Sequence, residues 1–127
     1  MGDMTKNFSR SEFACKDGCG LDRIDPDLVD ELQASRDAAG IPYAINSGCR
    51  CQKRNREEGG ADDSAHTPRP NGFCGAADIV CLDMLTRKKI LADVTKRFRH
   101  IGIHKLFIHV DNDPSKPEGV YLYLEGG

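Results

Sequence analysis

Two histidines and one aspartate stand at positions where metal-binding chemistry can be expected. His66 lies in a glycine-rich polar stretch, whereas Asp78 and His109 each interrupt a short apolar run. A carboxylate inside an apolar strand is costly unless it is paired or bound to a metal. Taken singly, each residue has an ordinary explanation as a hydrogen-bonded core residue or a cap. Together they form a ligand set suited to a catalytic zinc ion, which takes three protein ligands and leaves one position for water.

Six cysteines form a second group with possible chemistry, and they are spaced as Cys15 and Cys19, Cys49 and Cys51, and Cys74 and Cys81. An even number permits a disulfide framework. A structural zinc site is the rival interpretation, but the usual C-x-x-C spacing is absent. We therefore favour buried free thiols or one or two local disulfides over a cysteine-rich zinc site.

Length and charge limit the class of protein. A chain of 127 residues is expected to form one domain with its own core. A net charge of −2 with no basic stripe argues against a nucleic-acid partner. No apolar run is long enough to span a membrane, and the first residues lack the apolar segment of a signal peptide. We expect a monomer that is made in the cytosol and does not insert into membranes.

The helices that must position the candidate ligands are indicated by their end signals. Asp25 and Pro26 are typical of a helix start and Gly40 of a helix end, so a helix is predicted between them. A second helix is predicted to be capped by Thr86, with Gly102 following its end.

Four segments have the apolar or alternating pattern of strands, namely 43–47, 77–82, 106–110 and 120–124. Residues 48–75 are polar and are predicted to form one long loop, of a length that is usually functional or disordered. Because helices and strands do not alternate strictly, we expect an α+β fold. The prediction is a single domain over residues 1–127, with a small, largely antiparallel sheet and two main helices packed on it.

Short motifs in a fixed order strengthen the metal hypothesis, and they are Ser47-Gly48-Cys49-Arg50, Ser64-Ala65-His66, Gly75-Ala76-Ala77-Asp78 and Phe107-Ile108-His109-Val110-Asp111. This pattern resembles the zinc D-alanyl-D-alanine carboxypeptidase family, which includes phage endolysins and shares its metal-site fold with the hedgehog signalling domain. The resemblance extends from about Phe8 to Asp111.

The resemblance implies a role for each matched residue. His66, Asp78 and His109 correspond to the family's zinc ligands. Arg50 corresponds to an arginine that binds substrate carboxylate or carbonyl groups, for which a planar guanidinium is well shaped. Ser64 is a further candidate for substrate contact. The segment between His66 and Asp78 is longer than is usual in the family, which predicts a loop insertion within 67–74 that could reshape the cleft.

The general base is the main departure from the family pattern. Many members place an acidic residue three positions before the last histidine, where this chain has Leu106. Asp111 shares the strand face of His109 and is the first candidate for the base, with orientation of a ligand as its alternative role. His104 is the second candidate, but it has the opposite parity to His109 and needs a bend to reach the metal.

Three other groups of residues have ordinary explanations. The charged stretch 54–58 is predicted to be a solvated surface. Arg97, Arg99 and His100 are placed at a helix C-terminus, where cations are favoured. Tyr121 and Tyr123 share one strand face, and packing at the edge of the core is favoured over lining a cleft.

The leading hypothesis is a zinc metallopeptidase that cuts the stem peptides of bacterial peptidoglycan, either as a D-Ala-D-Ala carboxypeptidase or as an endolysin-type endopeptidase. A phage enzyme released to the wall by a holin fits the small size, and a cytosolic enzyme that recycles wall fragments is an alternative. Leu106 favours a different class, a non-catalytic zinc-containing module that binds peptidoglycan. A virion structural component is the third hypothesis.

Overall fold

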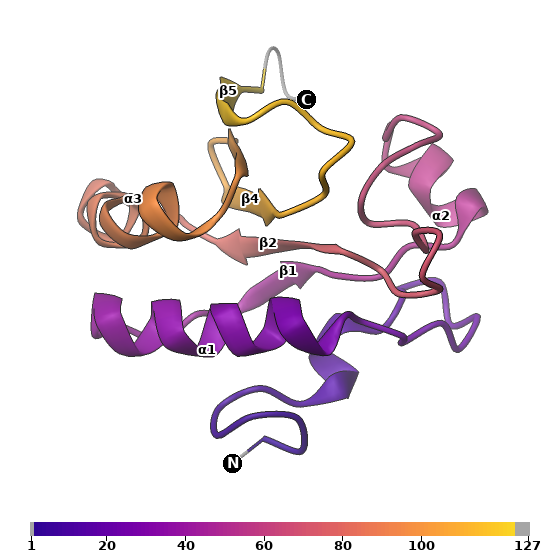
Figure 1. The fold of residues 1–127 in the computed structure, drawn as a ribbon, viewed down its shortest axis with the longest axis horizontal. Coiled ribbons are helices and arrows are strands. Elements are labelled where there is room, and N and C mark those ends of the chain that lie inside the picture. The colour runs from indigo at the N-terminus through magenta and orange to yellow at the C-terminus, as the bar shows by residue number, and fades with distance from the viewer. Residues whose placement is uncertain (1, 124–127) are drawn as a thin grey trace.

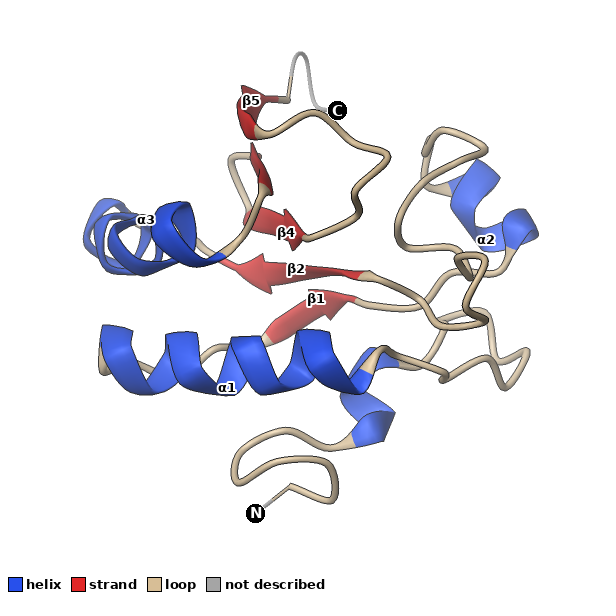
Figure 2. Ribbon diagram, in the orientation of Figure 1, coloured by secondary structure: helices blue, strands red, loops and turns tan. Residues whose placement is uncertain are grey.

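The computed structural model describes residues 2–123 and contains one sheet with helices packed against it (Figures 1 and 2). The helical elements are the 3₁₀ helix η1 (Arg10–Phe13), α1 (Pro26–Ala39), α2 (Gln52–Glu57) and α3 (Met84–Arg97). The strands are β1 (Ile45–Ser47), β2 (Ala76–Val80), β3 (His100–Ile103), β4 (Phe107–Asp111) and β5 (Gly119–Leu122). In the part of the chain so described, no helix is long and apolar enough to cross a membrane.

The strands lie in the order β1-β2-β4-β3-β5. Among the described strands, β3 and β5 pair in parallel, whereas each other neighbouring pair is antiparallel. Helices α1 and α3 contact each other and contribute to the core that the sheet forms. The predicted α+β fold, with a largely antiparallel sheet and two main helices, is therefore confirmed.

Side-chain alternation divides the sheet into an apolar face and a polar face. Ile79 of β2 and Ile108 and Val110 of β4 are fully buried in the same core as the apolar residues of α1 and α3. Asp78 and His109 stand between or beside these residues on the same strands, so their side chains point to the opposite face. The helices therefore cover the apolar face, and the polar face is left for the loop that carries His66.

Helix α1 begins and ends as predicted. The Asp25 carboxylate accepts a hydrogen bond from the backbone N–H of Asp27 at 2.9 Å, and Pro26 occupies the first turn. Gly40 ends the helix with a φ of 72°, a left-handed conformation that glycine adopts without steric penalty.

Helix α3 differs from its prediction at both ends. Its N-cap is Asp83 and not Thr86, because the Asp83 carboxylate accepts from the backbone N–H of Thr86 at 2.8 Å. Thr86 lies inside the first turn. The helix ends at Arg97, with Phe98 as C-cap, and Gly102 lies within β3 and not just after the helix.

Three of the described elements, η1, α2 and β3, are absent from the sequence prediction. Helix α2 is wholly polar, and Asn55 is its one buried residue, so no apolar periodicity marks it. Strand β3 starts at His100, two residues after α3. The prediction had assigned His100 to the helix terminus. The predicted strand 120–124 is β5, which ends at Leu122, and Leu124 lies outside the described residues.

One disulfide joins segments on either side of the candidate ligand His66. Cys49 is bonded to Cys74 across 25 residues, so the bond is not local as expected. Cys15 and Cys81 are buried free thiols, in agreement with the other part of the prediction. The bond ties the segment around Gly48 to the chain that leads into β2.

The cap of α3 gives a stability prediction. Asp83→Ala should lower the free energy of unfolding and shift the urea midpoint downward, because an N–H of the first turn loses its acceptor. Thr86→Ala removes a hydroxyl that donates to Asp83 but leaves that acceptor in place, so its loss should be smaller. Urea unfolding of both variants measures the difference, and an equal or larger loss for Thr86→Ala would contradict the assignment.

Candidate metal centre

Three ligand-type atoms converge on the polar face of the sheet. His66 Nε2 lies 3.2 Å from Asp78 Oδ1 and 3.2 Å from His109 Nδ1. The third side of this triangle, from His109 Nδ1 to Asp78 Oδ1, measures 3.0 Å. All three side chains are buried. The predicted ligands therefore lie together, although they come from two strands and a loop.

Local structure explains how the three residues meet. Asp78 and His109 are direct partners in the antiparallel pair of β2 and β4, so their side chains leave the same face side by side. His66 is held from the loop by its backbone, because its carbonyl accepts from the N–H of Arg50 at 2.9 Å. The Ser64 hydroxyl accepts from the N–H of His66 at 3.2 Å.

Hydrogen bonds outside the triangle fix which ring nitrogen faces it. His66 Nδ1 lies 2.7 Å from the carbonyl oxygen of Gly48, to which it can only donate. The lone pair of a neutral His66 is therefore at Nε2, inside the triangle. A histidine ligand that donates its other N–H to a carbonyl is the usual arrangement at a metal site.

Asp111 orients the ring of His109, as the carbonyl of Gly48 orients the ring of His66. Its Oδ2 lies 2.6 Å from His109 Nε2, and its Oδ1 accepts from the backbone N–H of Asp113 at 3.0 Å. With its side chain only 1% exposed, the carboxylate is enclosed between these donors. Asp111 thus contacts the ring nitrogen that does not face the triangle.

His100 lies beside this pair and forms a second metal-type cluster with His109 and Asp111. Here His109 Nε2 already bonds to Asp111, and His100 Nδ1 lies 2.8 Å from the carbonyl of Pro117. In this second cluster the ring nitrogens are therefore already engaged in hydrogen bonds. The triangle of His66, Asp78 and His109 has ligand atoms that face one another and is the better candidate for a metal.

Arg50 lies against the other oxygen of Asp78. Its Nη2 is 3.3 Å from Asp78 Oδ2, and its Nε donates to the hydroxyl of Ser47 at 3.1 Å. The ion pair occupies Oδ2 and leaves Oδ1 to face the two histidines. Arg50 also lines the cleft above the ligands, so the guanidinium lies between a ligand and the space for a substrate.

Protonation of the metal-free site follows from these contacts. Burial alone raises the pKa of Asp78, but the charges and hydrogen bonds of His66 and His109 outweigh it and hold that pKa below its usual range. Burial lowers the pKa of His109, whereas Asp111 and Asp78 raise it to about 9. Without metal, His109 is protonated at neutral pH, and a bound cation must displace this proton.

The ligand triangle fits a zinc ion. Bonds of about 2.0–2.1 Å to tetrahedral ligands place those ligands about 3.3 Å apart. The three separations of 3.0, 3.2 and 3.2 Å are close to this spacing. Two imidazoles and one carboxylate are also the donor types that zinc takes at catalytic sites, with a fourth position left for water. The residues present therefore fit the ion.

A cleft of about 290 Å³ opens beside the triangle, and residues that line it include Arg50, Glu58, Ser64, His66, Phe107, His109, Lys116, Tyr121 and Tyr123. The expectation that Tyr121 and Tyr123 only pack at the edge of the core is therefore wrong. A side chain at Gly102 would overlap the ring of Tyr121, so the bare backbone of β3 is what lets this ring lie across it.

Two further residues, His104 and Glu58, occupy positions that differ from what their sequence contexts indicate. His104 lies in the turn between β3 and β4, and among the described residues it packs beside the cleft and is not one of those that line it. Its ring stacks on Phe107 with centroids 4.3 Å apart, while its Nδ1 accepts from the N–H of Leu106 at 3.1 Å. Glu58, expected on a solvated surface, is the one carboxylate on the cleft wall in the range 2–123.

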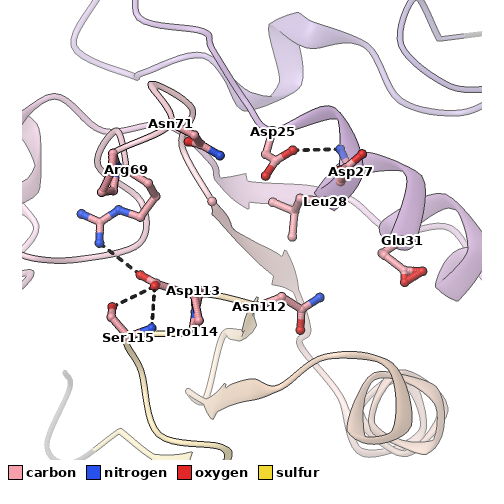
Figure 3. Close-up of a pocket in the computed structure, with 12 residues that line it drawn as sticks. Asp25, Asp27, Leu28, Glu31, Arg69, Asn71, Asn112, Asp113, Pro114 and Ser115 are labelled. Carbon is pink, nitrogen blue, oxygen red and sulfur yellow. Dashed lines mark hydrogen bonds and ion pairs between the residues drawn. The ribbon is translucent and has the colours of Figure 1, made fainter.

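The residues inserted after His66 form a different pocket. This pocket has a volume of about 530 Å³, and its lining includes Arg69, Asn71 and Asp113 but none of the three candidate ligands (Figure 3). Arg69 donates to the Asp113 carboxylate at 3.1 Å, which joins the insertion to the segment after β4. The insertion therefore lies outside the metal cleft, and none of its residues 67–74 lines that cleft.

Comparison with known proteins agrees with this geometry. The family described as Peptidase M15 matches residues 6–111, which include all three candidate ligands and Asp111. No curated protein sequence matched the chain. The match spans most of the chain and confirms the family resemblance found in the motifs. This chain therefore belongs to the peptidase M15 family of zinc metallopeptidases.

Proposed function

We propose that this protein is a zinc-dependent hydrolase that cuts peptide bonds in the stem peptides of bacterial peptidoglycan. The observation that carries the proposal is the triangle of His66, Asp78 and His109 beside an open cleft. A zinc ion held there supplies Lewis-acid chemistry, because it polarises a carbonyl and lowers the pKa of water. The surrounding residues must then orient the peptide and move protons.

The charge of the cleft supports a substrate that carries carboxylates. Arg50 and Lys116 both line it, and cations of this kind bind carboxylate groups through charge-assisted hydrogen bonds. Stem peptides are short and present free carboxylates at their ends and side chains. Ser64 lies on the same wall, although its hydroxyl already accepts from the N–H of His66. Lys116 is likewise engaged, because its ammonium donates to the carbonyl of Asp63 at 2.8 Å. We therefore assign substrate contact to Arg50 first, and to Lys116 and Ser64 second.

The two tyrosines supply hydrogen-bond donors. Burial raises the pKa of both phenols, so Tyr121 and Tyr123 remain protonated at neutral pH. Tyr121 donates to the oxygen of Tyr123 at 3.2 Å, which leaves the proton of Tyr123 for another acceptor. We assign to Tyr123 a hydrogen bond to the carbonyl oxygen of the peptide, where negative charge develops during hydrolysis.

The proton acceptor must face the cleft. Both oxygens of Asp111 are engaged by His109 and Asp113, so we propose Asp111 as a positioning residue. His104 Nδ1 accepts from Leu106, so a neutral His104 carries its proton on Nε2 and acts as a donor. Glu58 is a carboxylate on the cleft wall, paired at 2.5 Å with Arg54, and we propose it as the acceptor.

A non-catalytic module that binds wall peptides is the second candidate function. The observation in its favour is Leu106, which is 51% exposed at the position where the family commonly has an acid. Such a module would keep the metal and the cationic cleft but would release no product. A lytic role in a phage would in addition require a holin for access to the wall.

Hydrolysis and its dependence on metal can be tested directly. Purified protein incubated with peptidoglycan should release products that mass spectrometry identifies, and a chelator should abolish their release. Free D-alanine would indicate a carboxypeptidase, whereas shortened stem peptides would indicate an endopeptidase. His109→Ala is the control for contaminating enzymes. Binding of peptidoglycan without any product, at saturating zinc, would favour the non-catalytic module.

The proton acceptor can be assigned with neighbouring carboxylates. Glu58→Gln should lower kcat by about 100-fold or more, because an amide cannot take up the proton. Glu57→Gln, one position earlier on α2 and exposed, is the matched control and should leave kcat unchanged. If Glu58→Gln retained full activity while His104→Ala lost it, the role would pass to His104.

The role of Asp111 is separable from base catalysis by a zinc titration. In Asp111→Asn, the free zinc concentration that gives half of the maximal activity should rise by about 10–100-fold, because His109 loses its orienting acceptor. Activity should return at saturating zinc. Asp30→Asn removes an exposed carboxylate of α1, distant in the fold, and should not shift the titration. Failure of activity to return at any zinc concentration would make Asp111 the base, as the sequence first indicated.

A further inference from the structure

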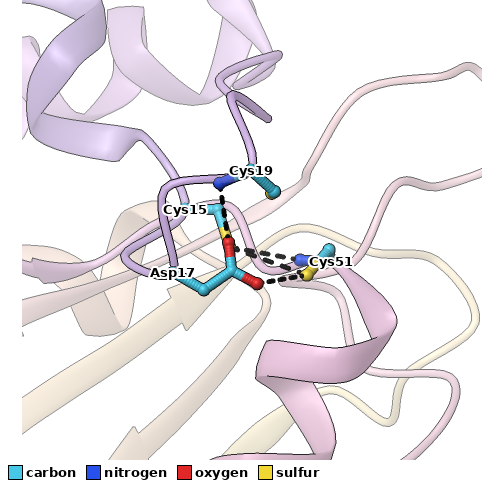
Figure 4. Close-up of side chains that lie close together, drawn as sticks. All are labelled: Cys15, Asp17, Cys19 and Cys51. Carbon is cyan, nitrogen blue, oxygen red and sulfur yellow. Dashed lines mark hydrogen bonds between the residues drawn. The ribbon is translucent and has the colours of Figure 1, made fainter.

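Four side chains outside the cleft converge on one point. The turn after η1 supplies Cys15, Asp17 and Cys19. The fourth side chain is that of Cys51, the N-cap residue of α2 (Figure 4). One ligand atom of each residue lies within 4.8 Å of every other. None of the four lines the cleft of the zinc site, so the cluster is distinct from the centre described above.

Two of the sulfurs are separated as ligands around one ion would be, and a carboxylate bridges them. Cys15 Sγ lies 3.9 Å from Cys51 Sγ, and two tetrahedral thiolates with zinc bonds of about 2.3 Å are about 3.8 Å apart. The Asp17 carboxylate bridges these thiols, with its Oδ1 3.2 Å from Cys15 Sγ and its Oδ2 2.9 Å from Cys51 Sγ. The N–H of Cys19 donates to Oδ1 at 2.9 Å and holds the carboxylate in this position.

Backbone donors also point at the two sulfurs. The N–H of Cys51 lies 3.5 Å from Cys15 Sγ, and the N–H of Arg54 lies 3.4 Å from Cys51 Sγ. Such N–H···S contacts favour a thiolate, which is the form that binds metals. In the metal-free chain the Cys51 thiol donates to Asp17, which raises the pKa of Cys51, so a bound cation must displace that proton.

We propose that Cys15, Asp17, Cys19 and Cys51 form a second, structural metal site that binds Zn²⁺ through three thiolates and one carboxylate. Four protein ligands close the coordination sphere, which is typical of structural and not catalytic zinc. A disulfide is the rival state of these residues. It would join two of the sulfurs and leave the third thiol and Asp17 without a shared partner, whereas a metal ion satisfies all four groups.

The proposal reverses the preference drawn from sequence spacing alone. That preference rested on the missing C-x-x-C pair, but here the ligands come from two segments, and Asp17 stands between two of the cysteines. Cys49, which sequence spacing pairs with Cys51, is instead bonded to Cys74. Only the folded chain shows that Cys51 belongs with Cys15 and Cys19.

The position of the cluster suggests what the metal does. Cys51 directly follows Arg50, which pairs with Asp78, and lies three residues after Gly48, whose carbonyl orients His66. A metal bound here would hold the 48–51 segment to the N-terminal part of the chain. It would thus stabilise the positions of two groups that orient the catalytic ligands, without contacting substrate.

Cobalt substitution distinguishes the two sites, because thiolate ligands give Co²⁺ an intense near-ultraviolet charge-transfer band and a His₂Asp site does not. The full chain should contain two equivalents of Zn²⁺ as isolated, and after exchange of the zinc for Co²⁺ it should show this band. The double variant His66→Ala/His109→Ala should retain one equivalent with the band intact. This variant tests the cysteine site even if the proposed peptidase function fails.

A matched pair of cysteine variants assigns the ligands. Cys51→Ser should abolish the band or reduce it severalfold, whereas Cys81→Ala, which removes a buried free thiol outside the cluster, should preserve it. Bound zinc should also protect three thiols from alkylation until a chelator is added. If Cys51→Ser does not fold, the double histidine variant and the alkylation pattern of the natural chain still decide the question. No thiolate band in either protein, or a disulfide between two of these cysteines in the freshly isolated chain, would overturn the proposal.

Discussion

The cross-strand pairing of Asp78 with His109 is the constraint on which the rest of the site depends. The two residues face each other in the register of β2 and β4, with their ligand atoms 3.0 Å apart. Apolar neighbours on both strands bury the opposite face of the sheet. Because side chains alternate, a slip by one residue would place a carboxylate in the core and an isoleucine in the cleft. The hydrophobic pattern that stabilises the sheet therefore also fixes the metal site.

The register of the two strands buries the negative charge of Asp78, and neighbouring cationic and hydrogen-bonding side chains balance it. A buried carboxylate is costly unless it is paired, and Asp78 is paired with Arg50 on one oxygen and faces the histidines with the other. His109 is supported in turn by Asp111, which is held by the backbone of Asp113. Each group is thus oriented by the next group in this series of hydrogen bonds. Because His109 and the backbone of Asp113 engage both oxygens of Asp111, neither oxygen is left for a substrate.

The sequence predicted the ligands on the strands more directly than the residues that loops and turns bring to the site. Asp78 and His109 were recognisable because they interrupt apolar strands, and His66 because a motif places it in order before them. The facing of Asp111 toward His109 also follows from strand parity. Which of its roles it performs depends on which ring nitrogen it meets, and no residue pattern encodes that.

Glu58 was beyond prediction from sequence patterns, and His104 was named from the sequence without its position in the fold. Glu58 follows a polar helix that has no apolar stripe, and His104 comes to the polar face through a hairpin whose first strand was taken for a helix end. The cysteine cluster is a stronger case, because its ligands are separated by more than thirty residues between Cys19 and Cys51. Spacing rules describe ligands on one local turn, and they fail when tertiary structure assembles the set.

The segment from Gly48 to Cys51 shows why such assembly is needed. It contributes one carbonyl and one guanidinium to the centre, and it lies outside any helix or strand. Fixing a loop residue costs roughly 1–2 kcal/mol of backbone entropy, which one hydrogen bond to a histidine does not offset. The segment is instead held at one position by the Cys49–Cys74 disulfide and at the other by the contacts of Cys51. Anchoring on both sides of Arg50 lets a loop orient buried ligands that the strands alone do not reach.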